Sequence, residues 1–401
     1  YFLEKSTGRP AFIVEKRRAG AGAPAPASAA EGVPFFALDA VFEGAPRALE
    51  AAAQRIMARR QVILGEEVSA FEREFAAAAG AAHAVGVANG TDALTLALWA
   101  AGVGPGDAVI TTALSAPATV VAILRAGAVP HIVDVSPDAL TIDPAAVEKA
   151  LRSGVKAKAL VPVHLYGNPC DMDRLSRLAA EHGLAVVEDC AQSFGARAGG
   201  KPCCSYSKAA AFSFYPTKNL GAYGDGGAVT TDDAALAAEL RRMRFYGQDA
   251  AGECVTRGLN SRLDELQAGL LRERLAGAAA GNRERAAVVE TYDRELGFLR
   301  PVPSRPGRAP HLYVVRPADR EGFRRHMSAR GVQTGVHYPL ALNRHRHFRE
   351  QAVAGDCPAA EAACASVTSL PLYPGLTAAQ VARVVEACKA WSAKAPVRSG
   401  A

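Results

Sequence analysis

Residues 158–190 read KALVPVHLYGNPCDMDRLSRLAAEHGLAVVEDC and contain the order of elements that decides the fold. Two mostly apolar runs, KALVPVHL (158–165) and LAVVEDC (184–190), are typical of strands that are covered on both faces. Between them, DMDRLSRLAAEHG (171–183) has the spacing of a helix, opens on a capping aspartate and closes on glycine. A strand, a helix and a second strand in this order predict a parallel βαβ unit.

The same alternation extends from about residue 84 to residue 229. Further apolar runs at 84–88, 108–112 and 129–135 predict strands, and DALTLALWAAG (92–102) predicts a helix between the first two. We therefore expect an α/β fold whose large domain is a doubly wound mixed sheet, spanning residues 33–270 with an N-terminal arm.

The flanks of this region differ in composition. Residues 19–32 read AGAGAPAPASAAEG, a tract without apolar periodicity, so residues 1–32 are expected to form a flexible tail. Towards the other end, helix candidates at 264–296, 319–330 and 377–392 accompany one strand candidate, HLYVVR (311–316). They predict a smaller C-terminal α+β domain over residues 271–401.

Composition limits the classes of function. The chain has 401 residues, 49% of them hydrophobic, and its net charge of +6 is spread along the sequence, so nucleic acid is not the expected partner. Eight cysteines without regular spacing indicate reduced thiols, and no histidine or cysteine spacing indicates a metal site. Because no run of 18 apolar residues occurs, we expect no membrane span and a cytoplasmic location.

Two candidate site segments lie where strands are expected to end. Residues 87–92 read VANGTD, and the exposed amides of such a glycine turn at a helix start bind anions, with Thr91 adding a hydroxyl; a plain turn with Thr91 as N-cap is the alternative. Asp189 and Gln192 lie at the C-terminal end of a second predicted strand, at the edge where open α/β sheets bind ligands. Asp189 either caps a loop or faces a cationic group such as a protonated pyridine nitrogen.

The third candidate segment is FSFYPTKNLG (212–221), followed by GDGG (224–227). It places Lys218 in an aromatic loop bounded by glycines, which is an unusual position for a strongly hydrated charge, although most lysines are simply exposed. Burial would lower the basicity of this amine and leave it able to attack an aldehyde.

Several longer strings resemble the motif series of the DegT/StrS family of sugar aminotransferases, which are fold-type I enzymes dependent on pyridoxal 5'-phosphate (PLP). The resemblance runs from about residue 33 to residue 389 and rests on NGTDAL, PVHLYG, EDCAQSFGA, FSFYPTKNLGAYGDGGAV, NSRLDELQAG, GVHYP and SLPLYP. It implies that Lys218 forms the internal aldimine and moves protons, that Asp189 pairs with the pyridine nitrogen, and that Gln192 lies beside the ring. The same resemblance places the cofactor phosphate at Gly90, Thr91 and Ser213.

The resemblance also implies partners and substrates. Asn260 would come from the other subunit, which implies a homodimer with shared active sites, while Arg262 and Tyr338 would face the substrate. L-glutamate would donate the amino group and a nucleoside-diphosphate keto sugar would accept it, in a ping-pong cycle through the pyridoxamine form. Related enzymes that dehydrate sugars have histidine in place of Lys218, which argues against that reaction here.

Two positions depart from the family pattern. Ala116 stands where an aromatic residue often stacks on the cofactor ring, and Asn343 stands where a histidine is common. Three alternatives therefore remain beside the leading hypothesis: action on an aminocyclitol, dehydration by an enzyme of the same fold, and a PLP-binding regulatory protein without turnover.

Overall fold

The computed structural model describes residues 32–38 and 46–392. The tail predicted for residues 1–32 lies outside the described residues, apart from Gly32. Within the described part of the chain, no helix is both long enough and apolar enough to cross a membrane.

An eight-stranded mixed sheet forms the centre of the structure, in the order β1-β9-β8-β5-β4-β2-β3-β11. Strands β8, β5, β4, β2, β3 and β11 run parallel to one another, whereas β9 is antiparallel to both β8 and β1. Strand β1 therefore runs in the same direction as β8. The strands are β1 (His83–Val87), β2 (Ala108–Thr112), β3 (Val129–Val133), β4 (Ala157–Val161), β5 (Ala185–Asp189), β8 (Ala209–Ser213), β9 (Gly227–Thr231) and β11 (Val353–Ala354).

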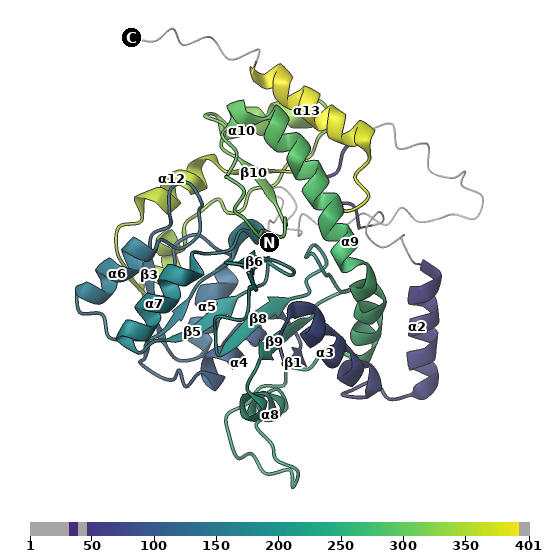
Figure 1. The fold of residues 1–401 in the computed structure, drawn as a ribbon, viewed down its shortest axis with the longest axis vertical. Helices are drawn as coiled ribbons and strands as arrows, with labels where there is room; N and C mark the ends of the chain where they lie inside the picture. Colours follow the sequence, from purple (N-terminus) through teal and green to yellow (C-terminus); the bar gives the residue numbers. More distant parts are fainter. Residues whose placement is uncertain (1–31, 39–45, 393–401) are drawn as a thin grey trace. The chain divides into compact units, whose positions relative to one another are not determined.

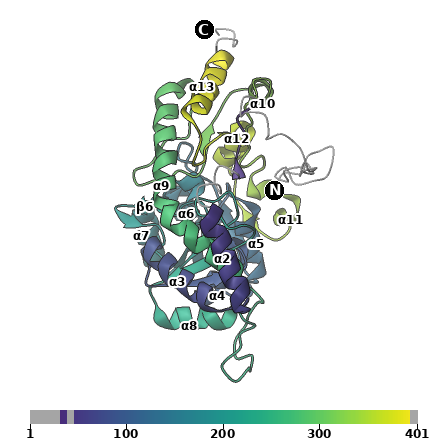
Figure 2. The same ribbon diagram turned by 90° about the vertical axis from the view of Figure 1, so that its right-hand side faces the viewer.

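Helices cover both faces of this sheet (Figures 1 and 2). One face packs against α4 (Gly90–Ala100), α5 (Pro117–Arg125) and α8 (Ala234–Met243) through a core that includes Leu94, Ile123 and Leu240. The opposite face packs against α3 (Glu66–Ala79), α6 (Pro144–Arg152), α7 (Met172–His182) and the first half of α9 (Glu265–Glu295). Successive strand residues alternate between the two cores, so each strand is apolar on both faces as the sequence predicted.

Three strands of the sheet, β8, β9 and the two-residue β11, were not identified from the sequence. Strand β8 reads AAAFS, and its alanines carry little of the β-branched signal by which a strand is recognised. Phe212 and Ser213, expected in a loop, are the last two residues of this strand. Ser213 consequently stands at a strand end, which is the position that a ligand-binding residue requires.

The long helix α9 contributes to two cores. Its residues Ala268 and Leu271 pack beneath the sheet, whereas Val289 and Tyr292 belong to a second core with Phe323 and Val384. That second core is built by α10 (Arg320–Ser328), α13 (Ala378–Ser392) and the pair β10 (Tyr313–Val315) and β12 (Thr368–Leu370). The domain boundary predicted at residue 270 falls inside α9, and the division into two domains stays a prediction.

The remaining elements are short or peripheral. They are α2 (Pro46–Arg59), α11 (Arg346–Arg349), α12 (Pro358–Ser366), the hairpin β6 (Arg197–Ala198) and β7 (Lys201–Pro202), and the 3-10 turns Leu165–Gly167, Gly297–Leu299 and Leu342–Arg344.

A buried carboxylate joins α3 to α9. Glu265 at the start of α9 accepts hydrogen bonds from the backbone amides of Gly65, Glu67 and Val68, at 2.7, 3.0 and 2.9 Å. These amides belong to the first turn of α3, whose own N-cap residue, Gly65, has no side chain to satisfy them. Glu265 therefore caps α3 from another helix.

Candidate active site

Three segments singled out in the sequence meet at the carboxyl edge of the sheet. Strands β1, β5 and β8 run in the same direction, so Asn89, Asp189 and Ser213, at or just beyond their ends, lie at one edge. A small cavity at this edge is lined by residues from two of these strand ends and by the lysine loop, among them Gln192, Ser213 and Lys218.

The start of α4 lies against the end of β8. A β-carbon added to Gly90 would come within 2.6 Å of the Ser213 β-carbon, so Gly90 permits a contact that no other residue allows. The helix is capped by Asn89, whose side chain accepts a hydrogen bond from the Asp92 amide at 2.8 Å. Thr91 is therefore not the N-cap residue. Gly90, Thr91 and Ser213 surround a helix N-terminus, which is the kind of site that binds a phosphate group.

Asp189 is buried at the end of β5, with 7% of its surface exposed. One carboxylate oxygen accepts a hydrogen bond from the Ala191 amide at 3.1 Å, and the other accepts one from the Thr119 hydroxyl at 3.0 Å. Burial raises the pKa of Asp189, while these two hydrogen bonds and the positive charge of Lys218 oppose the rise. Asp189 thus both supports its own loop and faces the positive charge of Lys218. The interpretation as a loop cap and the interpretation as the partner of a cationic group are therefore compatible.

Lys218 lies in the loop between β8 and β9. Its backbone amide donates to the carbonyl of Tyr215 at 2.8 Å, and Gly221 lets the loop fold back, because a β-carbon there would be 2.4 Å from the Pro216 carbonyl oxygen. Burial lowers the pKa of Lys218 to about 8, although the negative charge of Asp189 opposes this effect. About a tenth of the amine is consequently uncharged at pH 7, far more than for an exposed lysine, and the uncharged amine is the nucleophile.

Gln192 connects the site to two tyrosines. Its side-chain oxygen accepts a hydrogen bond from the Tyr166 amide at 2.8 Å, and its nitrogen donates to the Tyr338 hydroxyl at 3.1 Å. The Tyr166 hydroxyl in turn donates to the carbonyl of His337. Tyr166 was missed as a site residue, although the PVHLYG string that contains it had been noted. Tyr338 is brought to the site by this network.

Asn260 and Arg262 lie on a different segment, between α8 and α9. Asn260 is exposed and pairs through its backbone with Phe245. The guanidinium of Arg262 lies 5.1 Å from the ring centre of Phe245 and 5.9 Å from that of Tyr246. Their assignments to the cofactor and the substrate stay predictions.

The structure also shows the surroundings of Ala116 and Asn343, the two residues that depart from the family pattern. Ala116 is the N-cap residue of α5 and has no side-chain cap. Asn343 is buried and donates to Glu361 at 2.8 Å, so its amide points towards α12.

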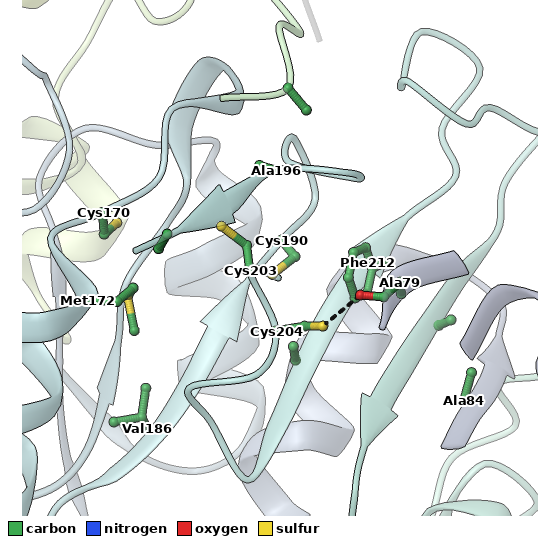
Figure 3. Close-up of a cluster of buried hydrophobic side chains, with 14 of the residues drawn as sticks. Ala79, Ala84, Cys170, Met172, Val186, Cys190, Ala196, Cys203, Cys204 and Phe212 are labelled. Atoms are coloured by element: carbon green, nitrogen blue, oxygen red, sulfur yellow. Dashed lines mark hydrogen bonds between the residues drawn. The ribbon is translucent and has the colours of Figure 1, made fainter. Parts of the chain in front are cut away.

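A buried histidine and carboxylate lie behind the site. His164, Glu188 and Cys190 offer atoms within 4.8 Å of one another, the spacing of a metal site. Hydrogen bonds already occupy this group: His164 Nδ1 accepts from the Cys170 amide at 3.0 Å, so Nε2 carries the proton that it donates to Glu188 at 3.0 Å. Cys170, Cys190, Cys203 and Cys204 lie in the surrounding core (Figure 3), and all eight cysteines are free thiols.

Fold and site together define a PLP-dependent transferase of fold type I. A buried amine, a buried carboxylate able to hold a proton on a pyridine nitrogen, and a glycine and serine pair at a helix N-terminus fit the aldehyde, ring and phosphate of PLP. The chain belongs to the DegT/DnrJ/EryC1/StrS aminotransferase family, whose model matches residues 47–389.

Individual relatives agree with this assignment. The chain is 44% identical over 367 residues to the dTDP-3-amino-3,4,6-trideoxy-alpha-D-glucose transaminase of Streptomyces venezuelae, covering 90% of this chain and 96% of that protein. The crystal structure of S. venezuelae DesV is similar, with a TM-score of 0.87 at 43% identity, covering 90% of this chain and 99% of DesV. NtdA of Bacillus subtilis with bound cofactor PMP has a TM-score of 0.83 at 28% identity, covering 90% and 85% of the two chains. The predicted family, fold class, cofactor and sugar aminotransferase activity are confirmed.

Proposed function

We propose that this chain transfers the amino group of L-glutamate to the keto group of a nucleoside-diphosphate sugar. The observation that carries the proposal is the placement of the Lys218 amine opposite the buried Asp189 carboxylate at one edge of the sheet. When bound, PLP supplies an electron-withdrawing ring that stabilises negative charge on the substrate carbon.

The residues of the chain then have separate tasks. Asp189 keeps a proton on the ring nitrogen, and Thr119 holds its carboxylate in place. Lys218 Nζ would take the proton from the α-carbon of the amino donor and hold it for return during the transfer. Gln192, held by the Tyr166 amide, would contact the cofactor and positions the hydroxyl of Tyr338, which would face the substrate.

We also propose a homodimer in which Asn260 and Arg262 complete the partner's site. An exposed apolar patch supports an interface beside this segment. Its side chains are 41–65% exposed and come from α2, the segment before α3, the lysine loop and the start of α9: Met57, Val62, Ile63, Tyr223 and Leu266. These segments are joined by hydrogen bonds from Glu265 to Val62 and from Tyr223 to Gln267. A second subunit covering the patch would remove this apolar surface from water.

The free thiols also favour a reducing compartment, and we place the protein in the cytoplasm.

The first test is an absorbance spectrum of the protein with PLP, before and after L-glutamate is added without sugar. We expect the cofactor band to change with release of 2-oxoglutarate. Lys218→Ala should lose both the protein-bound band and the glutamate response. Lys208→Ala, which changes an exposed lysine directly before β8, should keep both and serves as the matched control.

The outcomes separate the alternatives. A glutamate response that persists in Lys218→Ala would remove the central assignment. A bound cofactor that responds to no amino donor would indicate a regulatory protein or a reaction other than transamination.

A further inference from the structure

Arg285 is an unusual residue for the interior of α9. It is 1% exposed, and within residues 32–38 and 46–392 it forms no ion pair with a carboxylate. Within the same described ranges, its Nε atom has no hydrogen-bond partner, and its one side-chain hydrogen bond runs from a terminal nitrogen to Asn282 at 3.5 Å. A buried charge without a partner costs folding free energy, and in the poorly screened interior its electrostatic effect extends to the groups around it.

A chain of hydrogen bonds leads from Arg285 to the loop of the reactive amine. The Asn282 side-chain oxygen accepts from Arg285 and also from the side-chain nitrogen of Asn219 at 2.8 Å. Asn219 directly follows Lys218. Its oxygen is bonded to Nδ1 of His311 at 3.0 Å, and its nitrogen also donates to the carbonyl of Pro310 at 3.2 Å.

This arrangement determines the tautomer of His311. The Pro310 carbonyl can only accept a hydrogen bond, so the amide nitrogen of Asn219 must face it and the amide oxygen must face His311. An oxygen can only accept, so His311 Nδ1 carries a proton and the lone pair of the neutral ring is on Nε2. Among the described residues, this Nε2 has no hydrogen-bond partner, although His311 is only 6% exposed.

We propose that Arg285 acts through Asn282 and Asn219 to hold His311 as an uncharged imidazole near Lys218, so that no second positive charge forms beside the reactive amine. His311 is faced by Lys218 from the β8–β9 loop, by Arg285 from α9 and by His337 from the segment before the 3-10 turn at residue 342. Burial together with these three groups places the pKa of His311 well below its usual value. Arg285 itself stays charged, because burial lowers its pKa only to about 10. The inference rests on the proposed role of Lys218, and Arg285, Asn282, Asn219 and His311 are positioning residues.

The test follows PLP capture by the cofactor-free protein between pH 5 and 8. Protonation of PLP itself affects every variant equally, so the rate of each variant is divided by the wild-type rate at the same pH. In Arg285→Gln, the pKa of His311 should rise, because one of the positive charges that face it is lost. The charge then formed at the acid end should lower the pKa of Lys218 further, so that more of the amine is uncharged and the rate ratio rises about tenfold. The ratio should be flat above pH 7.

Two double variants identify the titrating group. Arg285→Gln with His311→Asn should restore a flat ratio, because asparagine keeps a donor for Asn219 and cannot become charged in this range. Arg285→Gln with His326→Asn should keep the acid rise, since His326 is similarly buried but lies in the C-terminal core, bonded to Ala387. A flat ratio for Arg285→Gln alone, or an acid rise that survives His311→Asn, would overturn the proposal.

A direct measurement on the wild-type protein tests the proposal even if a variant does not fold. In the cofactor-free wild-type protein with 13C-labelled histidine, the His311 resonances should not titrate between pH 5 and 8, and a transition in that range would refute the proposal. Lys218→Ala distinguishes the two levels of the argument. If Lys218→Ala captures PLP like the wild type, the proposed function fails; if it does not, and Arg285→Gln shows no acid rise, only this inference fails.

Discussion

Gly90→Ala tests the proposed phosphate site at the contact between α4 and β8. The new methyl group would lie 2.6 Å from the Ser213 β-carbon and 3.1 Å from both its α-carbon and its hydroxyl oxygen. Because the α-carbon belongs to the backbone of β8, rotation of the Ser213 side chain cannot relieve the whole overlap. We expect the free energy of unfolding to fall by about 1–3 kcal/mol, the usual cost of overpacking. Displacement of Ser213 should also weaken PLP binding about tenfold, the loss expected for one hydrogen bond to a charged group.

The assay is urea unfolding followed by tryptophan fluorescence, since Trp99 lies within α4 itself, with PLP affinity measured by titration. Gly277→Ala is the matched control: this glycine lies inside α9 with no atom within 4 Å of an added β-carbon, so alanine should stabilise the helix by about 0.5–1 kcal/mol. Adding Ser213→Gly to Gly90→Ala should recover part of the stability but not the PLP affinity. Unchanged stability and unchanged affinity in Gly90→Ala would refute the packing of Gly90 against Ser213.

Three further predictions follow from the same structure. Asp189→Asn should still bind PLP but convert it with glutamate about a hundredfold more slowly, because an amide does not hold a proton on the ring nitrogen; stopped-flow absorbance measures this, and an unchanged rate would contradict it. Glu265→Gln should lower the free energy of unfolding by on the order of 3 kcal/mol, because three amides of α3 lose a charged acceptor; an unchanged urea midpoint would exclude the capping role. Mixing inactive Lys218→Ala and Asn260→Ala subunits should restore about a quarter of the sites if each site takes Lys218 from one subunit and Asn260 from the other, whereas no recovery after subunit exchange would argue against shared sites.

Two simple rules placed Asp189 and Gln192 at a ligand-binding edge: apolar runs with helices between them form a parallel sheet, and such sheets bind ligands beyond the carboxyl ends of their strands. Lys218 was joined to them by the resemblance to the DegT/StrS family, because strand β8 was not identified from the sequence. The residues that support the site are different, because each is linked to its partner by a contact between distant segments. Thr119 reaches Asp189 across 70 positions, Asn282 reaches Asn219 across 63, and His311 reaches Asn219 across 92. Local patterns do not encode such pairs.

The position of His311 in the site could not be predicted from the local sequence pattern. HLYVVR was interpreted as a strand, yet only Tyr313–Val315 is extended, and His311 instead crosses the site with its backbone amide bonded to Tyr166. This one segment therefore contacts the Tyr166 side of the site through its backbone and the Lys218 side through its ring. Its importance depends on the path of the chain, which propensities alone do not give.

The charges of the buried groups in the site affect one another's pKa values. Burial raises the pKa of Asp189 and lowers that of Lys218, so each group alone is driven towards its uncharged form, while the charge of each opposes the shift of the other. An additional cation at His311 would disturb this balance, because it would further disfavour the charged amine while also making a proton available beside it. The uncharged, fixed imidazole avoids both effects. Arg285 contributes a permanent positive charge that is separated from Lys218 by two asparagines, so it can act on His311 without occupying the position of a substrate.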